Sequence, residues 1–172
     1  RALVIDGDVT LTARALHDAA TRLAKVLIAR RPAGGRGGGV VSFMLPNWHE
    51  AAIIYMAATL AGMAAHPILP SLRDHDLTFM LDDVGSDFLF IPAQFRGYDY
   101  AAMLDRVTPH VSRPPVVVTV RGAGTAGQVA FDALLSEQAD AALPALDADD
   151  VRMVMYTSGT TGRPKGVMHT HN

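Results

Sequence analysis

The sequence predicts an α/β fold, in which a largely parallel sheet is flanked by helices. Apolar strand-like runs alternate with segments of helical periodicity from residue 40 onward, and a complete strand, turn, helix and strand unit spans 40–68. The last apolar run leads into a glycine-rich polar segment at 157–166. This segment lies at the carboxyl end of the predicted strand, which is the place where open α/β sheets bind ligands. With 172 residues, 49% of them hydrophobic, the chain can bury one sizeable core.

Residues 1–36 are expected to form an amino-terminal strand and helix, and residues 37–172 an α/β subdomain. A short strand at 2–6 is closed by the turn Asp6-Gly7-Asp8. Thr12 is placed to cap a helix over 13–31. The apolar residues of that helix keep a three-four spacing, which indicates one buried face: Leu16, Ala19, Ala20, Leu23, Val26 and Leu27.

The strand-helix-strand unit begins after five glycines within residues 32–39, which end the first helix. A buried strand is expected at 40–45 and another at 64–68. Asn47 is placed to cap the helix at 51–62, with Glu50 at the reciprocal position of a capping box. Such a unit crosses over right-handed to a parallel neighbour, which supports the predicted fold class.

The remaining elements follow in alternation. Helices are expected at 72–84, with Leu77, Met80, Leu81 and Val84 inward, and then at 98–107 and 131–138; strands are expected at 87–91 and 115–120. An acidic, alanine-rich linker at 139–150 leads to a strand at 151–156, whose mostly uninterrupted apolar run predicts burial on both faces.

The segment Thr157-Ser158-Gly159-Thr160-Thr161-Gly162-Arg163-Pro164-Lys165-Gly166 combines three glycines, four hydroxyl side chains, two cations and no acid. Glycines permit close backbone approach, amide groups can form an anion-binding concavity, and hydroxyls and lysine add donors. The order of residues is not the Walker pattern, and the apolar Val167 and Met168 that follow predict a loop between two strands. A flexible surface turn is the alternative.

The string YTSGTTGRPKGV, followed by His171-Asn172, resembles the phosphate-loop signature of the superfamily of AMP-forming acyl-CoA synthetases, adenylation domains and luciferases. Leu45-Pro46-Asn47 with Glu50, and Pro67 with Pro70, are similar to the opening region of these enzymes, although Gly38-Gly39 stands where the family often has Gly-Asp. The resemblance implies the incomplete amino-terminal domain of an adenylate-forming enzyme. It implies that the β and γ phosphates of ATP contact Thr157, Ser158, Gly159, Thr160, Thr161, Gly162, Lys165 and Gly166, with Lys165 also acting in catalysis.

The resemblance further implies an ATP-dependent ligase that activates a carboxylic or fatty acid as an acyl-adenylate and transfers it to coenzyme A, with Mg²⁺ accompanying ATP. Two alternatives stay open: an adenylating enzyme that loads a carrier protein, and a non-catalytic nucleotide-binding module. The chain starts without Met and stops after the loop, so we expect a fragment that is inactive alone. Surface exposed by truncation would favour a homo-oligomer.

Composition and charge bear on four further classes: nucleic-acid-binding, membrane, secreted and metal-binding proteins. A net charge of −2 gives no electrostatic case for nucleic acid, and no run reaches the ~20 apolar residues that span a bilayer. The absence of cysteine and of a secretory segment is compatible with the cytoplasm. No metal site is expected: Asp74-His75-Asp76 is interpreted as a solvated helical face, and His169 with His171 lacks a third ligand. His49 and His66 are expected to make structural hydrogen bonds.

Overall fold

A computed structural model describes residues 1–35, 37–157 and 163–172. Among these residues the main sheet has the strand order β11-β10-β4-β3-β5-β8-β9. All neighbours pair in parallel except β10 and β11. The strands of this sheet are β3 (Val40–Phe43), β4 (Ala64–Pro67), β5 (Phe88–Pro92), β8 (Val116–Val120), β9 (Val129–Ala130), β10 (Met153–Thr157) and β11 (Lys165–His169). The predicted α/β fold with a largely parallel sheet is confirmed.

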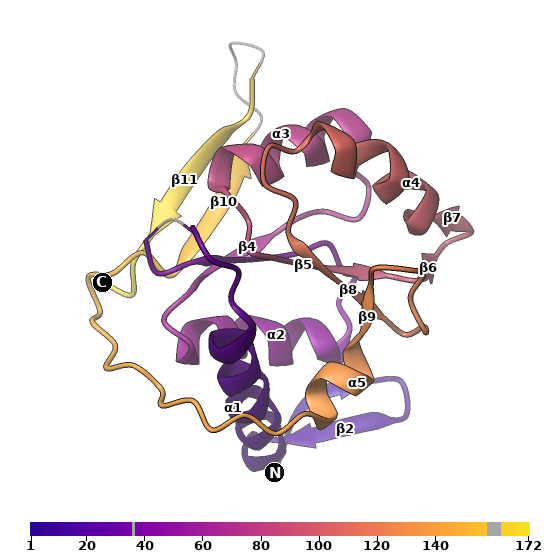
Figure 1. The fold of residues 1–172 in the computed structure, drawn as a ribbon. Coiled ribbons are helices and arrows are strands. Elements are labelled where there is room, and N and C mark those ends of the chain that lie inside the picture. Colours follow the sequence, from indigo (N-terminus) through magenta and orange to yellow (C-terminus); the bar gives the residue numbers. More distant parts are fainter. Residues whose placement is uncertain (36, 158–162) are drawn as a thin grey trace.

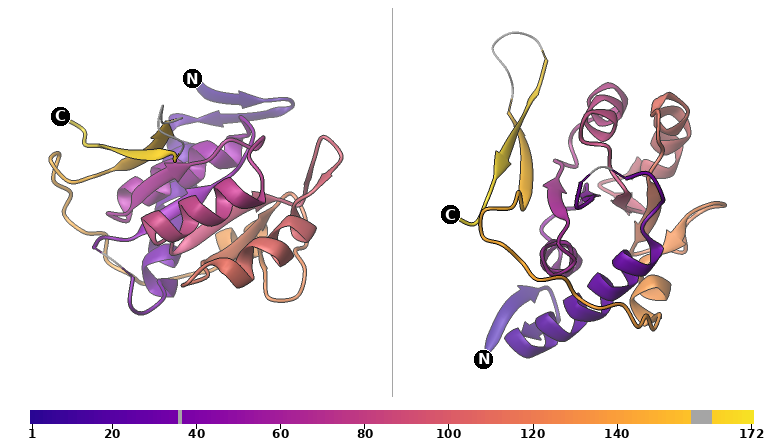
Figure 2. Two further views of the ribbon diagram at one scale, coloured as in Figure 1. Left: turned by 90° about the horizontal axis from the view of Figure 1, so that it is seen from above. Right: turned by 60° about the vertical axis from the view of Figure 1, so that its left-hand side comes forward.

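Helices cover both faces of the sheet (Figures 1 and 2). One face packs on α1 (Ala13–Arg30), α2 (His49–Leu60) and α5 (Phe131–Ser136), and the other on α3 (Asp74–Val84) and α4 (Tyr100–Val107). A 3₁₀ turn (Thr108–His110) follows α4. Strand β5 separates the two layers, because its alternate residues point to opposite faces. Phe88 and Phe90 join the core with α1 and α2, whereas Leu89 and Ile91 join the core with α3 and α4.

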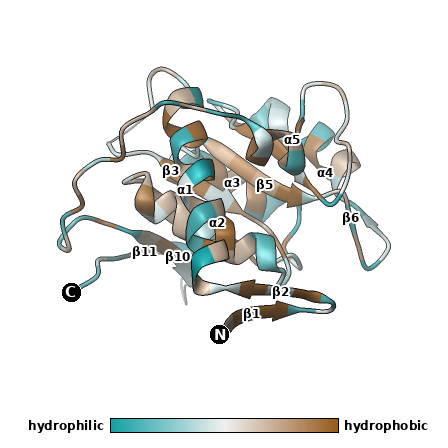
Figure 3. Cartoon of the chain, turned by 90° about the horizontal axis from the view of Figure 1, so that it is seen from below, coloured by the Kyte–Doolittle hydropathy of each residue, from teal (hydrophilic) through white to brown (hydrophobic). Residues whose placement is uncertain are grey.

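The amino-terminal residues form a hairpin of β1 (Ala2–Asp6) and β2 (Val9–Thr12) that leads into α1. The Thr12 hydroxyl accepts a hydrogen bond from the Ala15 N–H at 3.1 Å, so the predicted cap is confirmed. Figure 3 shows the apolar strands of this hairpin at the rim of the molecule. Their exposed side chains include Leu3 and Ile5. The boundary expected at residue 36 falls on a position outside the described residues and stays a prediction.

The predicted capping box at the start of α2 is wrong. The residue that precedes the helix is Trp48, whose side chain makes no capping hydrogen bond. The backbone N–H of His49, the first residue of the helix, is bound instead by the distant Asp6 carboxylate. Glu50 lies inside the helix and forms an ion pair with Arg121 instead. A guanidinium is a stronger partner for a buried carboxylate than one backbone N–H, and the sequence separation of this pair hides it from local patterns.

A small hairpin of β6 (Gln94–Phe95) and β7 (Tyr98–Asp99) occupies the region after β5, where the sequence predicted the first turn of a helix. Its turn residues, Arg96 and Gly97, have φ of 51° and 73°. Two consecutive positive φ values match the right-handed twist of a two-residue hairpin. Helix α4 therefore starts at Tyr100, with Asp99 accepting a hydrogen bond from the Ala102 N–H at 2.9 Å.

The glycine-rich turn before β3 closes around a buried carboxylate. Asp87 is fully buried, accepts a hydrogen bond from the Val40 N–H at 3.1 Å, and forms ion pairs with Arg31 at 3.3 Å and Arg113 at 2.8 Å. A Cβ added at Gly39, which has φ of 101°, would lie 2.7 Å from the Asp87 carboxylate. Glycine is therefore required there by both backbone conformation and space.

Strand β10 differs from its prediction of burial on both faces, which is wrong for this chain. Met155 is 43% exposed and Thr157 is exposed, while the other residues of β10 are half-buried. Strand β10 lies between β11 and β4 and pairs in parallel with β4 at Met153 and Ala65. Its Tyr156 packs against a hydrophobic core cluster, whereas Met155, on the opposite face of the strand, is exposed. None of the described helices is long and apolar enough to cross a membrane.

Candidate functional site

The glycine-rich segment joins β10 to β11 in an antiparallel hairpin that projects from the body of the molecule (Figures 1 and 2). The register runs from Met153 opposite His169 to Thr157 opposite Lys165. The two strands predicted on either side of this segment are therefore confirmed. Ser158, Gly159, Thr160, Thr161 and Gly162, five of the predicted phosphate-binding residues, lie outside the described residues.

Thr157 and Lys165 face each other where the loop leaves and re-enters the hairpin. Both residues are exposed, and Lys165 has no ion-pair partner within residues 1–35, 37–157 and 163–172. The two strands of the hairpin, MVMYT and KGVMH, contain no acid. A cation at the mouth of a loop without a nearby carboxylate is available to an anionic ligand.

Tyr156, the residue before Thr157, ties the hairpin to α3. Its hydroxyl donates a hydrogen bond to Asp83 at 2.5 Å. Its ring packs against His66, at 5.3 Å between ring centroids, and edge-on against Phe79 at 6.1 Å. Burial and the Asp83 carboxylate raise the pKa of Tyr156, so its hydroxyl keeps its proton and acts as a donor.

Gly166, predicted to bind phosphate, lies directly opposite Tyr156 in the hairpin. A Cβ at this position would lie 3.3 Å from the Tyr156 ring and 3.2 Å from the Val154 side chain, closer than ordinary contact. The glycine therefore leaves room for the aromatic ring on its own face of the hairpin. This packing contact explains the residue type at 166 independently of any ligand.

A cavity of about 490 Å³ lies between the hairpin and the end of α3. Asp83, Arg152, Val154, Tyr156, Gly166 and Met168 are among the residues that line it. Arg152 is 2% exposed and donates hydrogen bonds to the Asp147 carbonyl at 3.0 Å and the Asp150 carboxylate at 3.1 Å. These contacts fasten the end of the 139–150 linker to the start of β10.

His66 lies under α3 in a row of buried polar groups. Its Nδ1 is 2.9 Å from the Ser42 hydroxyl, which in turn is 2.5 Å from the Ser86 hydroxyl. The expected structural hydrogen bond of His66 is thus confirmed. Burial disfavours the charged ring and lowers the pKa of His66 to about 4, so the ring is neutral at pH 7.

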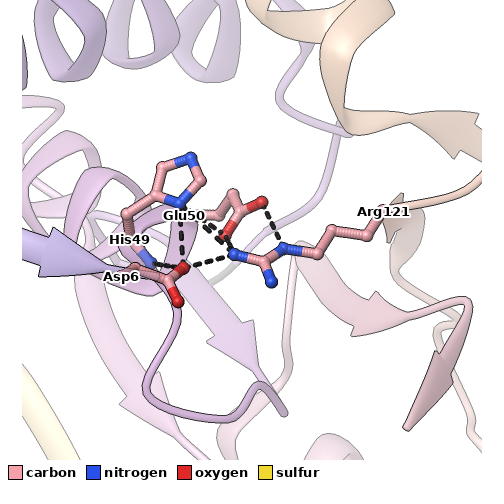
Figure 4. A network of polar contacts seen from close by, with 4 residues as sticks. All are labelled: Asp6, His49, Glu50 and Arg121. Carbon is pink, nitrogen blue, oxygen red and sulfur yellow. Dashed lines mark hydrogen bonds and ion pairs between the residues drawn. The ribbon is translucent and has the colours of Figure 1, made fainter. Parts of the chain in front are cut away.

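A second cluster joins the amino-terminal hairpin, α2 and the end of β8 (Figure 4). His49 donates its backbone N–H to the Asp6 carboxylate at 3.0 Å, and its Nδ1 lies 3.0 Å from the same oxygen. Arg121 donates to Asp6 and to both oxygens of Glu50, and its guanidinium lies 4.0 Å from the centre of the Trp48 ring. Hydrogen bonds from the backbone and side chain of His49 and the nearby Arg121 lower the pKa of Asp6 to about 2.

Asp6, His49 and Glu50 form the single group of three close oxygen and nitrogen ligands that the described residues bring together. The guanidinium of Arg121 already lies against both carboxylates and neutralises them. The cluster is therefore an ion-pair network built around arginine. Asp74, from the other candidate cluster, forms an ion pair with Arg106 on α4, and the side chain of its neighbour His75 is 96% exposed.

Two of these arrangements escaped sequence reasoning. The Arg121 network joins residues more than 70 positions apart, and no local signal marks it. The Tyr156 contact had a signal: Asp82 and Asp83 stand in the last turn of α3, where the helix dipole disfavours acids. Each of these acids has a partner far away in the sequence. Asp82 accepts a hydrogen bond from the Ser112 N–H at 2.8 Å, and Asp83 accepts one from the Tyr156 hydroxyl.

Known proteins are similar to this chain in sequence and in fold. The chain is 29% identical to a medium-chain fatty-acid–CoA ligase of Escherichia coli over 99% of its own length and 30% of that protein. It is 33% identical to a long-chain-fatty-acid–CoA ligase of Mycobacterium tuberculosis over 95% of its length and 30% of that protein. A crystal structure of an anthranilate CoA ligase in complex with anthranoyl-AMP matches 99% of the chain and 32% of that structure, with a TM-score of 0.87 at 20% identity.

The chain thus spans about 30% of the curated relatives it matches. The profile of the AMP-binding enzyme family matches all of residues 1–172, including the hairpin and the segment between Thr157 and Lys165. On this match the chain belongs to the AMP-binding enzyme family.

Proposed function

We propose that the chain is the amino-terminal part of the large domain of an ATP-dependent, AMP-forming acyl-CoA synthetase, with the loop between β10 and β11 as its polyphosphate site. The observation that carries the proposal is the pair Thr157 and Lys165, which face each other at the mouth of a loop without acids. In this proposal Thr157, Ser158, Gly159, Thr160, Thr161, Gly162, Lys165 and Gly166 contact the β and γ phosphates of ATP.

The proposed reaction has two steps: adenylation of a carboxylate and transfer of the acyl group to coenzyme A. A substrate carboxylate oxygen attacks the α phosphorus of ATP, the bond from that phosphorus to the bridging oxygen breaks, and pyrophosphate leaves with the electron pair. The thiol of coenzyme A then loses its proton to solvent and its sulfur attacks the acyl carbon. The bond from that carbon to the phosphate oxygen breaks, AMP leaves with the electron pair, and a thioester is formed. Lys165 and the loop amides stabilise the negative charge that grows on the leaving pyrophosphate. They also hold ATP in line for attack.

Magnesium would accompany ATP in such a reaction. The described hairpin strands offer no carboxylate to hold the ion, and Mg²⁺ commonly binds through substrate phosphates with one or two carboxylates. The hairpin of this chain therefore does not fit a magnesium site by itself, and no step is assigned to the ion here.

The substrate proposed for the parent enzyme is a small-molecule carboxylate. The relatives are named for medium-chain and long-chain fatty acids and for 3-hydroxybenzoate, all of which share the carboxyl group. The chain alone is proposed to be inactive, and surface exposed in it is proposed to favour a homo-oligomer. A cytoplasmic location also belongs to the proposal, without a transmembrane segment and without nucleic acid as a partner.

The test is carboxylate-dependent exchange of pyrophosphate into ATP by the full-length protein that carries this chain. Lys165→Ala is expected to lower the exchange rate about 100-fold, the usual cost of removing one group that stabilises a transition state. Lys25→Ala, at the only other lysine in the sequence, is the matched control and is expected to exchange at the wild-type rate. A folded protein that binds ATP and exchanges with no acid would contradict the proposal.

Coenzyme A and a carrier protein are then compared as acceptors of the activated acyl group. Thioester formation with coenzyme A supports the ligase proposal. Transfer only to a carrier protein would replace the second step and leave the first unchanged. Light scattering of the isolated chain tests the homo-oligomer, and a mass that stays monomeric at all concentrations would exclude it.

A further inference from the structure

Tyr156 is the last half-buried residue before the proposed phosphate-binding loop. Its neighbour Thr157 is exposed and already belongs to the loop mouth opposite Lys165. The position of the tyrosine ring therefore fixes where the loop leaves the sheet. Any group that holds this ring also sets the place of Lys165 across the hairpin.

The contacts of Tyr156 come from three directions. Its hydroxyl reaches Asp83 at 2.5 Å, its ring lies against His66 on β4 and Phe79 on α3, and Gly166 leaves space for it on the facing strand. By contrast, β10 has only one paired position with β4, Met153 opposite Ala65. Among the described contacts that hold the hairpin against β4 and α3, the side-chain contacts of Tyr156 are thus the ones nearest the loop.

Asp83 lies in an unfavourable place for an acid unless it has a partner. It stands in the last turn of α3, two residues before Gly85, which ends the helix in the left-handed conformation. The helix carbonyls at this end repel a carboxylate. The hydrogen bond from Tyr156 supplies a donor that offsets this repulsion, and the raised pKa of Tyr156 keeps the donor protonated.

We infer that Tyr156 and Asp83 are positioning residues for the polyphosphate site: the hydrogen bond between them fixes the base of the hairpin, so that Lys165 is presented at the right distance from the ATP phosphates. Gly166 serves the same arrangement by leaving room for the ring. The inference rests on the proposed function. It assigns Tyr156 no contact with substrate. Helix α3, which carries Asp83, is in this inference the element that determines the position of the loop.

Steady-state kinetics of the full-length protein test the inference in Tyr156→Phe, which keeps the ring and removes only the hydroxyl. The exchange reaction is expected to show kcat/KM for ATP lowered roughly 5- to 10-fold, the effect of losing one hydrogen bond to a charged acceptor near the surface. The KM for the carboxylate substrate is expected to stay unchanged. A general loss of folded protein would lower kcat and leave both KM values unchanged.

Two further variants identify Asp83 as the partner. Asp83→Ala is expected to match Tyr156→Phe, and the double variant is expected to be no worse than either single one, because both remove the same bond. Asp83→Asn keeps an oxygen acceptor and is expected to remain within about 2-fold of wild type. Tyr55→Phe, at an exposed tyrosine on α2, is the matched control and is expected to leave the kinetics unchanged.

The outcomes separate the inference from the proposed function. Exchange that falls in Lys165→Ala but stays at the wild-type level in Tyr156→Phe overturns the positioning role and leaves the synthetase proposal intact. Fully additive effects of Tyr156→Phe and Asp83→Ala also overturn it. Absence of exchange in the wild-type protein overturns both.

Discussion

Arg121 forms a two-pronged ion pair with Glu50: its Nε lies 2.8 Å from one carboxylate oxygen and its Nη2 lies 2.9 Å from the other. The side chain of Glu50 is only 8% exposed, whereas that of Arg121 is 37% exposed. The acid is thus the buried partner and depends on the arginine for its charge compensation. Arg121 holds a φ of 57° to make this contact.

Arg121→Ala is expected to lower the free energy of unfolding by about 2 kcal/mol, because it leaves the buried Glu50 carboxylate without its partner. Urea unfolding followed by circular dichroism measures the change. Arg96→Ala is the matched control, since Arg96 also has a positive φ but forms no ion pair among the described residues. Equal losses in the two variants would show that the ion pair does not stabilise the fold.

The lowered pKa of Asp6 predicts that the folded protein loses stability in acid. This pKa is lowered from 3.8 to about 2, chiefly by the hydrogen bond from the His49 backbone. A carboxyl group with a lowered pKa contributes stability above the unfolded value, and that contribution disappears as the pH falls from about 4 to 2. Urea midpoints over this window are expected to fall more steeply in wild type than in Asp6→Asn. Parallel profiles would contradict the assignment.

The lowered pKa of His66 predicts a second pH dependence of the free energy of unfolding, in a higher pH range. Its ring is neutral in the folded chain with a pKa of about 4, below the usual 6.5. Protonation therefore favours the unfolded state, and stability is expected to fall by about 3 kcal/mol as the pH drops from 6.5 to 4. His66→Asn should flatten the profile in this window. His75→Asn, at a histidine with a 96% exposed side chain, should leave the profile unchanged.

The glycine-rich turn predicts a contrast between two glycines. Gly39→Ala places a Cβ 2.7 Å from the Asp87 carboxylate and 2.9 Å from Arg31, in addition to its positive φ. Gly37→Ala has a positive φ and nothing within 4 Å. Thermal unfolding is expected to show a loss of about 1 kcal/mol for Gly37→Ala, from backbone strain alone, and at least about 2 kcal/mol more for Gly39→Ala. Similar losses would mean that Asp87 moves freely.

Local patterns were sufficient for much of the fold. The spacing of Leu16, Leu23 and Leu27 and the cap at Thr12 gave the bounds of α1 to within one residue. The alternation of apolar runs and helices predicted where strands β3, β4, β5 and β8 lie along the chain. These features depend on residues within one or two turns of each other, so the sequence displays them directly.

Long-range partners account for what the sequence did not show. Glu50 sits at the position of a capping residue, but its partner lies 71 residues later in the chain. The exposure of Met155 depends on which elements pack over its face of the sheet, and the apolar run MVMY carries no information about that. Of the predicted phosphate-binding residues, Thr157, Lys165 and Gly166 lie in the described hairpin, and their roles toward ATP stay predictions.

The buried Asp87 carboxylate has a consequence for how this sequence can vary over evolutionary time. It ties together Arg31, the backbone at Val40 and Arg113, and it tolerates no side chain at Gly39. Loss of the acid would remove one ion-pair partner from each of the two arginines, and loss of either arginine would leave a buried charge less compensated. Substitutions at positions 31, 87 and 113 therefore survive together more readily than singly, and these positions should covary among descendants of a common ancestor.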